Sequence, residues 1–204
     1  IRRPSRDMGV RVPHPPPTIN LRRTGPLLFL REYPYPKSVI ILEMKSEILK
    51  PVKLIVSLLV CLMAGVIGSI FTSISVDNWY KTLNKPVFNP PSWLFAPVWT
   101  FLYITMGFSL FLIWSYDDKQ NKRKYIALIF FSVQLFFNIL WSVFFFGMKS
   151  PFLAFVDIIL LWGSILITMI LFKRISVLSS ILLIPYFLWV TFAAFLNYAI
   201  LVMN

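Results

Sequence analysis

Residues 125–148 are YIALIFFSVQLFFNILWSVFFFGM, a stretch without a single charged side chain. A helix needs roughly 20 predominantly apolar residues to cross the hydrocarbon core of a bilayer, so this stretch has the length and composition of a transmembrane helix. Four further runs of comparable length lie between charged residues elsewhere in the chain, and Asp157 is the only charge inside them. The sequence therefore predicts an all-α membrane protein, a five-transmembrane-helix bundle with spans at about 53–73, 91–115, 125–147, 151–172 and 176–203.

The composition of the whole chain agrees with this interpretation. Of its 204 residues, 58% are apolar and only 14% are charged, whereas an ordinary soluble domain carries roughly 25% charged residues. The net charge of +12 invites a nucleic-acid partner, but basic residues that flank membrane spans explain it better. We therefore expect the lipid bilayer, and no nucleic acid, as a partner. Cys61 is the only cysteine, so no disulfide can form within one chain.

Residues 1–43 differ from the rest of the chain. They hold seven of the nine arginines and eight of the fifteen prolines, and a proline run such as that at 13–17 forms neither a helix nor a packed core. We expect a disordered extension or a non-native segment translated from upstream of a start at Met44. A targeting segment or a segment that contacts lipid headgroups is the alternative.

The basic residues of the short loops predict the orientation in the membrane. Nine lysines and arginines fall on the side of the N-terminus of the first span, and three fall on the other side. Because cytoplasmic loops carry the excess of positive charge, we expect the N-terminus in the cytoplasm and the C-terminus outside.

Several polar side chains lie inside the predicted spans, where they are costly and usually face the bundle interior. Gln134 and Asn138 share one face of the third span, and Asp157 lies two turns into the fourth. These three favour a ligand cavity over simple contacts between helices. Asn197, in the last span, favours a hydrogen bond across a dry helix interface.

Aromatic residues follow the same helix faces. Trp99 and Tyr103 share a face of the second span, and Tyr186 and Trp189 share a face of the fifth with Ala193 and Leu196. Pro185 is expected to kink that last helix. A cavity lined by indoles and a few amides suits a flat, aromatic ligand, while ordinary core packing is the alternative.

Two features allow two interpretations each. The loop at residues 74–90 contains Trp79 and Tyr80, and it is either a partly ordered lid or an aromatic belt at the membrane surface. Ala64, Gly68 and Thr72 recur every four residues in the first span. Small residues at this spacing let helices approach closely, either within the bundle or between two subunits.

In the order in which they occur, these residues resemble the TspO/MBR family of tryptophan-rich sensory proteins and translocator proteins, which includes the peripheral benzodiazepine receptor. The resemblance begins in the first loop with Trp79-Tyr80, Leu83, Lys85-Pro86 and Pro90-Pro91, and continues with Pro97-Val98-Trp99-Thr100 and Tyr103. It goes on with Gln134, Asn138 and Trp141-Ser142, then Asp157, and ends with Pro185-Tyr186, Trp189, Ala193 and Leu196-Asn197-Tyr198. It covers Met44 to Asn204, and residues 1–43 have no counterpart.

The resemblance implies a five-helix homodimer of the bacterial type, in the cell membrane, that binds tetrapyrroles such as protoporphyrin IX or haem as ligand, with no obligatory cofactor. The implied pocket residues are Tyr80, Trp99, Tyr103, Asn138, Trp189 and Ala193, with Gln134, Phe137, Asp157 and Leu196 nearby. Sterol binding is in doubt, because no basic residue follows Leu196 and Tyr198 as the sterol motif of animal relatives requires.

Three functions follow as expectations. The first is binding and sensing or translocation of tetrapyrroles. The second is light- and oxygen-dependent breakdown of a porphyrin, in which the resemblance implies Trp99 and Trp189 as the catalytic residues, although no conventional catalytic motif is present. The third is transport of another small apolar solute. His14 is the only histidine and lies outside the spans, so we expect no metal site and no strong axial ligation of a haem iron.

Overall fold

The computed structural model describes residues 37–116 and 121–204 of the chain. By its internal contacts the chain divides into two units, Ile1–Ser46 and Glu47–Asn204, and the second unit contains the bundle described below. The elements are α2 (Lys37–Ser75), α3 (Trp79–Thr82), α4 (Ser92–Ser115), α5 (Asn121–Ser142), the π-helical turn η1 (Val143–Gly147), α6 (Pro151–Lys173), α7 (Val177–Leu182) and α8 (Ile184–Met203).

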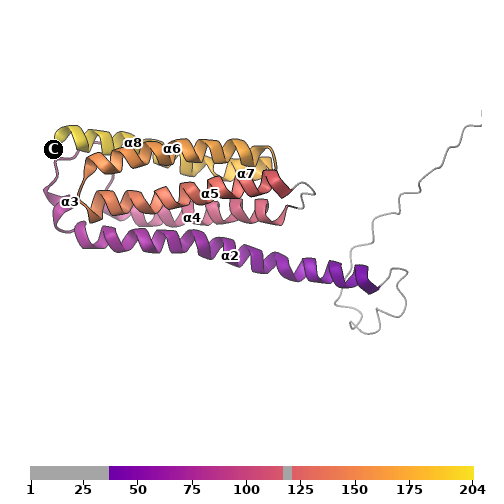
Figure 1. The fold of residues 1–204 in the computed structure, drawn as a ribbon. Coiled ribbons are helices and arrows are strands. Elements are labelled where there is room, and N and C mark those ends of the chain that lie inside the picture. Colours follow the sequence, from indigo (N-terminus) through magenta and orange to yellow (C-terminus); the bar gives the residue numbers. More distant parts are fainter. Residues whose placement is uncertain (1–36, 117–120) are drawn as a thin grey trace, which may run out of the picture. The chain divides into compact units, whose positions relative to one another are not determined.

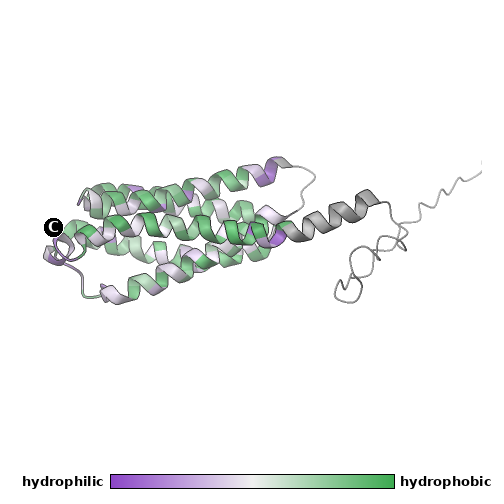
Figure 2. Cartoon of the chain, turned by 90° about the horizontal axis from the view of Figure 1, so that it is seen from below, coloured by the Kyte–Doolittle hydropathy of each residue, from purple (hydrophilic) through white to green (hydrophobic). Residues whose placement is uncertain are grey.

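Within the described residues, five helical segments are long and apolar enough to cross a membrane: Leu49–Ser75, Ser92–Ser115, Lys122–Gly147, Pro151–Lys173 and Val177–Met203. The predicted fold class and the five spans are confirmed. Figure 2 shows the hydrophobic colour along the length of these helices and the hydrophilic colour mainly near their ends and in the loops.

The last span is interrupted at Leu183, between α7 and α8. Pro185 lies in the first turn of α8, where its missing N–H is tolerated. In an uninterrupted helix, that N–H would be needed by the carbonyl four residues earlier. The chain instead makes a tight turn in which Leu183 N–H donates to Ser180 O at 3.2 Å. The predicted kink is therefore a tight turn at Leu183 between α7 and α8, within one membrane-length segment.

The helices of the bundle run alongside one another, with α5 packed on α6, α6 on α8, and α4 against α5, α7 and α8 (Figure 1). The first span joins through α4 and α5: a Cβ added at Gly107 of α4 would touch Leu58, and one added at Gly68 would touch Ser142 of α5.

Small side chains allow this close approach. The buried positions of the first span are occupied by Ser57, Cys61, Ala64, Gly68 and Ser75, which recur at the helical period and form one face. Because Ala64 and Gly68 are buried within a single chain, the small-residue spacing serves packing within the bundle. The opposite face of this span presents large apolar side chains such as Ile55, Leu59 and Ile70 outward.

Two clusters of buried apolar residues fill the bundle. The larger cluster occupies most of its length and includes Met106, Phe131 and Tyr186. The smaller one is built on Phe145, Phe146, Ala154, Leu196 and Ile200, and Trp79, Tyr80 and Leu83 of the first loop pack against it.

Most of the segment predicted to be an extension, residues 1–43, lies outside the described residues. The described part of this segment, residues 37–43, belongs to α2.

Replacing Gly107 by Ala should lower the melting temperature of the purified protein in detergent. The new Cβ would lie 2.9 Å from the Cα of Leu58 and 3.3 Å from its N, both backbone atoms, so α2 and α4 would have to move apart at a cost of about 1–3 kcal/mol. Gly163→Ala in α6 is the matched control, because nothing lies within 4 Å of its Cβ position. Alanine favours helix over glycine by about 1 kcal/mol, so the control should be neutral or stabilised. Equal melting temperatures for the two variants would contradict close α2–α4 packing.

Candidate functional site

Asn138 connects three helices in the middle of the bundle. Its Oδ1 accepts a hydrogen bond from the Tyr103 hydroxyl of α4, and its Nδ2 donates to the Tyr186 hydroxyl of α8 at 3.1 Å. All three side chains are buried. In the hydrocarbon core, hydroxyl and amide groups cannot hydrogen-bond to water. This bridge therefore sets how α4, α5 and α8 face one another.

The aromatic side chains predicted to line a pocket gather around this bridge. The Trp99 ring stacks on Tyr103 with centroids 5.5 Å apart and meets Tyr186 edge-on at 6.3 Å. We call Trp99, Tyr103, Asn138 and Tyr186 the intramembrane cluster.

Beside this cluster lies a space of about 10 Å³ lined by Trp99, Asn138, Trp141, Ile158, Leu161, Val190 and Ala193. That volume holds about one water molecule. Trp99, Asn138 and Ala193 are therefore brought together as predicted, but their side chains fill most of the space between them.

Gln134 and Asp157 add polar atoms without partners. Gln134 is 1% exposed and Asp157 is 3% exposed, and both amide atoms of Gln134 and Oδ2 of Asp157 lack hydrogen-bond partners. An unsatisfied buried polar group costs about 1–3 kcal/mol, so these two residues are the strongest internal sign that the bundle is built to hold something more.

The other predicted site residues lie around the edges of this region. Trp189 packs edge-on against Phe95 at 6.1 Å and tilts against Phe192 at 5.6 Å. Phe137 is partly buried against the larger cluster, and Leu196 belongs to the smaller one. Within the described part of the chain, the ring contacts of Trp99 and Trp189 are with other aromatic residues and not with each other.

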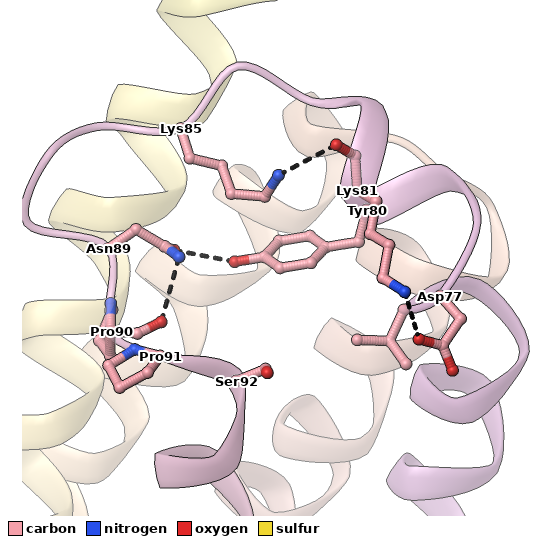
Figure 3. A pocket seen from close by; sticks show the side chains of 9 residues that line it. Asp77, Tyr80, Lys81, Lys85, Asn89, Pro90, Pro91 and Ser92 are labelled. Atoms are coloured by element: carbon pink, nitrogen blue, oxygen red, sulfur yellow. Dashed lines mark hydrogen bonds and ion pairs between the residues drawn. The ribbon is translucent and has the colours of Figure 1, made fainter.

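Tyr80 lies at the end of the bundle, in a separate and larger cavity of about 400 Å³. We call this the loop cavity; its lining comes from the first loop and the start of α4 and consists of Val76, Asp77, Tyr80, Lys81, Lys85, Asn89, Pro90, Pro91 and Ser92. Figure 3 shows the Tyr80 side chain crossing the cavity toward Asn89.

Tyr80 is held on several sides. Its hydroxyl donates to Asn89 Oδ1 at 2.8 Å, and its ring meets Phe146 at 5.8 Å and Phe145 at 6.2 Å. Burial raises the pKa of Tyr80 above its usual value of 10.0, although the hydrogen bond to Asn89 lowers it in part. The hydroxyl therefore stays neutral and protonated at physiological pH.

The π-helical turn η1 places Phe145 and Phe146 beneath the loop. Both rings are buried, and Trp79 packs on Phe145 with ring centroids 5.5 Å apart. The Ser75 hydroxyl at the end of α2 donates to Phe146 O at 2.7 Å. Because Trp79 and Tyr80 rest on these rings, the structure favours the lid over the aromatic belt as the interpretation of the loop.

Asn84 and Asn204 fasten this lid to the end of α8. Asn84 N–H donates to Asn204 Oδ1 at 3.0 Å, and Asn204 Nδ2 donates back to Asn84 O at 3.0 Å. Asn84 Nδ2 also donates to Met203 O at 3.3 Å. We call this pair the asparagine latch.

Comparison with known proteins agrees with the geometry. The model of the TspO/MBR family matches residues 57–203, a range that contains all the predicted site residues. The chain belongs to the TspO/MBR family. It is 46% identical to the tryptophan-rich protein TspO of Chlorobaculum tepidum over 71% of this chain and 90% of that protein. It is 41% identical to the tryptophan-rich protein TspO of Archaeoglobus fulgidus over 74% and 97%, and 34% identical to the human translocator protein over 66% and 79%.

Family membership makes this chain an integral membrane protein of the sensory and translocator type. The roles of its individual site residues stay predictions. Asn197 is explained by the structure: Trp141 Nε1 donates to its Oδ1 at 3.0 Å, and its Nδ2 donates to Pro151 O at 2.9 Å. As expected, it links helices across a dry interface.

Residues of the loop cavity other than Tyr80 were not among the predicted site residues of this TspO/MBR protein. Asn89 meets Tyr80, and Asn84 meets Asn204, through loop geometry that has no sequence period. The one signal available was the clustering of Lys85 and the prolines near Tyr80 in the family motif.

Replacing Asn204 by Ala should release the lid, because the side chain makes two of the latch hydrogen bonds. At about 0.5–1.5 kcal/mol each, their loss should speed opening of the loop roughly tenfold, measured as trypsin cleavage after Lys81 or as amide exchange at residues 79–85. Val202→Ala, on an outward-facing side chain of the same turn, is the control. Equal cleavage rates in both variants would show that the latch does not hold the loop.

Proposed function

We propose that this protein binds tetrapyrroles of the protoporphyrin IX type between α4, α5, α6 and α8, as a sensory or translocator protein of its family. The observation that supports this most is that α5 and α6, which line the inner space beside the aromatic cluster, also bury polar atoms without partners, the Gln134 amide and Asp157 Oδ2. A tetrapyrrole offers a broad flat face for the rings and central nitrogens for the polar atoms, so one ligand would satisfy both.

Binding would require the intramembrane cluster to open. The present space of about 10 Å³ is far below the roughly 300–1,000 Å³ of small-molecule pockets. The Trp99–Tyr103 stack contributes about 0.5–1.5 kcal/mol, and each hydrogen bond across transmembrane helices contributes about 0.6 kcal/mol. These terms are small beside the burial of a macrocycle, so the closed state is one that a ligand can displace.

The loop cavity is the natural entrance. It lies at the end of the bundle, and the lid over it rests on Phe145, which stacks on Trp141 with centroids 5.1 Å apart. Trp141 also lines the small inner space. A continuous series of aromatic faces therefore leads from the lid to the intramembrane cluster.

Ring packing would hold the ligand, rather than ligation of a metal. His14 is the only histidine of the sequence and lies before the first span, so the spans offer no imidazole to a haem iron. The proposal includes the orientation expected from the loop charges, with the loop cavity outside, and a homodimer formed through the outward-facing apolar surfaces of the spans.

Purified protein should bind protoporphyrin IX in the dark, seen as a shift in absorbance and a change in tryptophan fluorescence. Haem should bind within a few-fold of the metal-free ring, because the residues that the structure describes include no histidine for its iron. Ala193→Phe should weaken binding at least about tenfold by filling the inner space that Ala193 lines. Leu188→Phe, on the outward face of the same helix, is the control. Full affinity in Ala193→Phe would place the ligand elsewhere and refute the proposed site.

Light-driven breakdown of the bound porphyrin is the second candidate function. It is favoured by the position of Trp99, whose readily oxidised indole stacks on Tyr103 inside the cluster. There it would lie against a bound ring and could give an electron to its photoexcited state.

Substituting Trp99 and Trp189 by Phe separates this chemistry from binding. Phe keeps most of the apolar surface, so affinity should stay within roughly tenfold, while loss of the porphyrin spectrum under light and oxygen should cease. If the double Phe variant degrades the porphyrin as fast as the natural sequence does, the tryptophans have no chemical role and binding remains the function.

A further inference from the structure

The charged groups that line the loop cavity do not balance, because two are positive and one is negative. The cavity is lined by two lysines, an aspartate, a tyrosine, an asparagine and a serine, with three apolar residues between them. The charges and hydrogen bonds of these side chains indicate which kind of ligand group the cavity would bind.

Lys85 has a hydrogen to spare. Its Nζ donates to Leu83 O at 2.9 Å and to Lys81 O at 3.5 Å, and it lies 4.8 Å from the centroid of the Tyr80 ring. An ammonium carries three N–H donors, so one remains after the two carbonyls. Backbone carbonyls and a ring face orient a cation without neutralising it, and no carboxylate pairs with Lys85 among the described residues.

Asn89 also has a donor left, whereas its acceptor is taken. Its Oδ1 accepts from the Tyr80 hydroxyl at 2.8 Å, and one of its two amide hydrogens goes to Pro90 O at 3.1 Å. The second amide hydrogen finds no acceptor in the part of the chain that the structure describes. The Pro90 carbonyl can only accept, so it fixes which end of the amide faces Tyr80, and the Tyr80 hydroxyl then donates to Asn89 Oδ1 (Figure 3).

The aspartate of the cavity is already paired. Asp77 Oδ1 lies 2.9 Å from Lys81 Nζ, in an ion pair whose side chains are 77% and 68% exposed. An exposed pair of this kind contributes little to stability, but it leaves Lys85 as the cation of the loop cavity without a countercharge. With two lysines against one aspartate, the lining keeps one uncompensated positive charge, on Lys85, and the Asn89 amide adds a neutral donor beside it.

We propose that the loop cavity binds a carboxylate group of the ligand, with Lys85 as the charged partner and Asn89 as the neutral donor. This rests on the proposed function and adds to it the chemical class of the ligand: an amphipathic ring system with a carboxylate at one edge. The ring enters between the helices while its acidic edge stays at the lid. Tyr80 is a positioning residue, because it hydrogen-bonds to Asn89 and supports the Lys85 ammonium with its ring face.

The test compares protoporphyrin IX, which carries two propionic acid groups, with its dimethyl ester, which has the same ring without negative charge. Dissociation constants for both are measured with the full chain in nanodiscs of zwitterionic lipid, for the natural sequence and for Lys85→Gln. Partition of each ligand into the bilayer is the same for every variant, so the ratio of the two constants isolates the carboxylate. Lys149→Gln, which removes an exposed lysine from the turn between η1 and α6, outside the cavity lining, is the matched control.

A hydrogen bond to a charged group contributes about 1.5–3 kcal/mol, so the preference for the acid over the ester should fall at least about tenfold in Lys85→Gln. Ester binding should be unchanged, which also shows that the variant is folded. Lys149→Gln should keep the full preference. If the preference is the same in Lys85→Gln and the natural sequence, the carboxylate inference is wrong while tetrapyrrole binding stands. If neither acid nor ester binds to the natural sequence, the proposed function itself fails.

Discussion

The constraint on which the structure depends is that a polar group in hydrocarbon must find its partner inside the protein. Asn138 meets it by joining Tyr103 and Tyr186, and Asn197 by joining Trp141 and the carbonyl of Pro151. Serine and threonine hydroxyls do the same with backbone carbonyls, as when Ser109 donates to Ser179 O beside the break in the last span. The bonds of Asn138, Asn197 and Ser109 link different helices. These few side chains therefore fix which faces meet, while apolar packing supplies most of the contact area.

Packing and the candidate site are coupled through small residues. Gly65 of α2 lies directly against the Tyr103 ring, so the close approach of the first span holds the ring on which Trp99 stacks. The same span ends at Ser75, which bonds to the π-helical turn beneath the lid. A change in the position of α2 would therefore be felt both at the intramembrane cluster and at the loop cavity.

The spans were predictable from the sequence because hydrocarbon excludes charge, which leaves long uncharged runs as an unmistakable sign. The inner site was predictable in part: Trp99, Tyr103 and Asn138 each lie on a helix face that periodicity identifies. Periodicity carries no information about loop conformation, so the asparagine latch and the Lys85 contacts could not be predicted from the sequence. It also could not show that the inner space is closed, since closure depends on side-chain volumes summed over four helices. The π-helical turn at Val143–Gly147 was not predicted. The composition of a segment does not distinguish the i→i+5 hydrogen bonds of a π-helix from the i→i+4 bonds of an α-helix.

The small volume of the inner space beside Trp99, about 10 Å³, has a mechanical consequence. A ligand that enters there must push helices apart, and the space can only come at the expense of the surrounding lipid. The protein would then occupy a larger cross-section in its liganded form, and the work of expansion would be done against the lateral pressure of the bilayer. The affinity for such a ligand would then depend on membrane tension and on the packing of the acyl chains. The occupancy of the bundle would therefore change with the physical state of the lipid as well as with the ligand concentration.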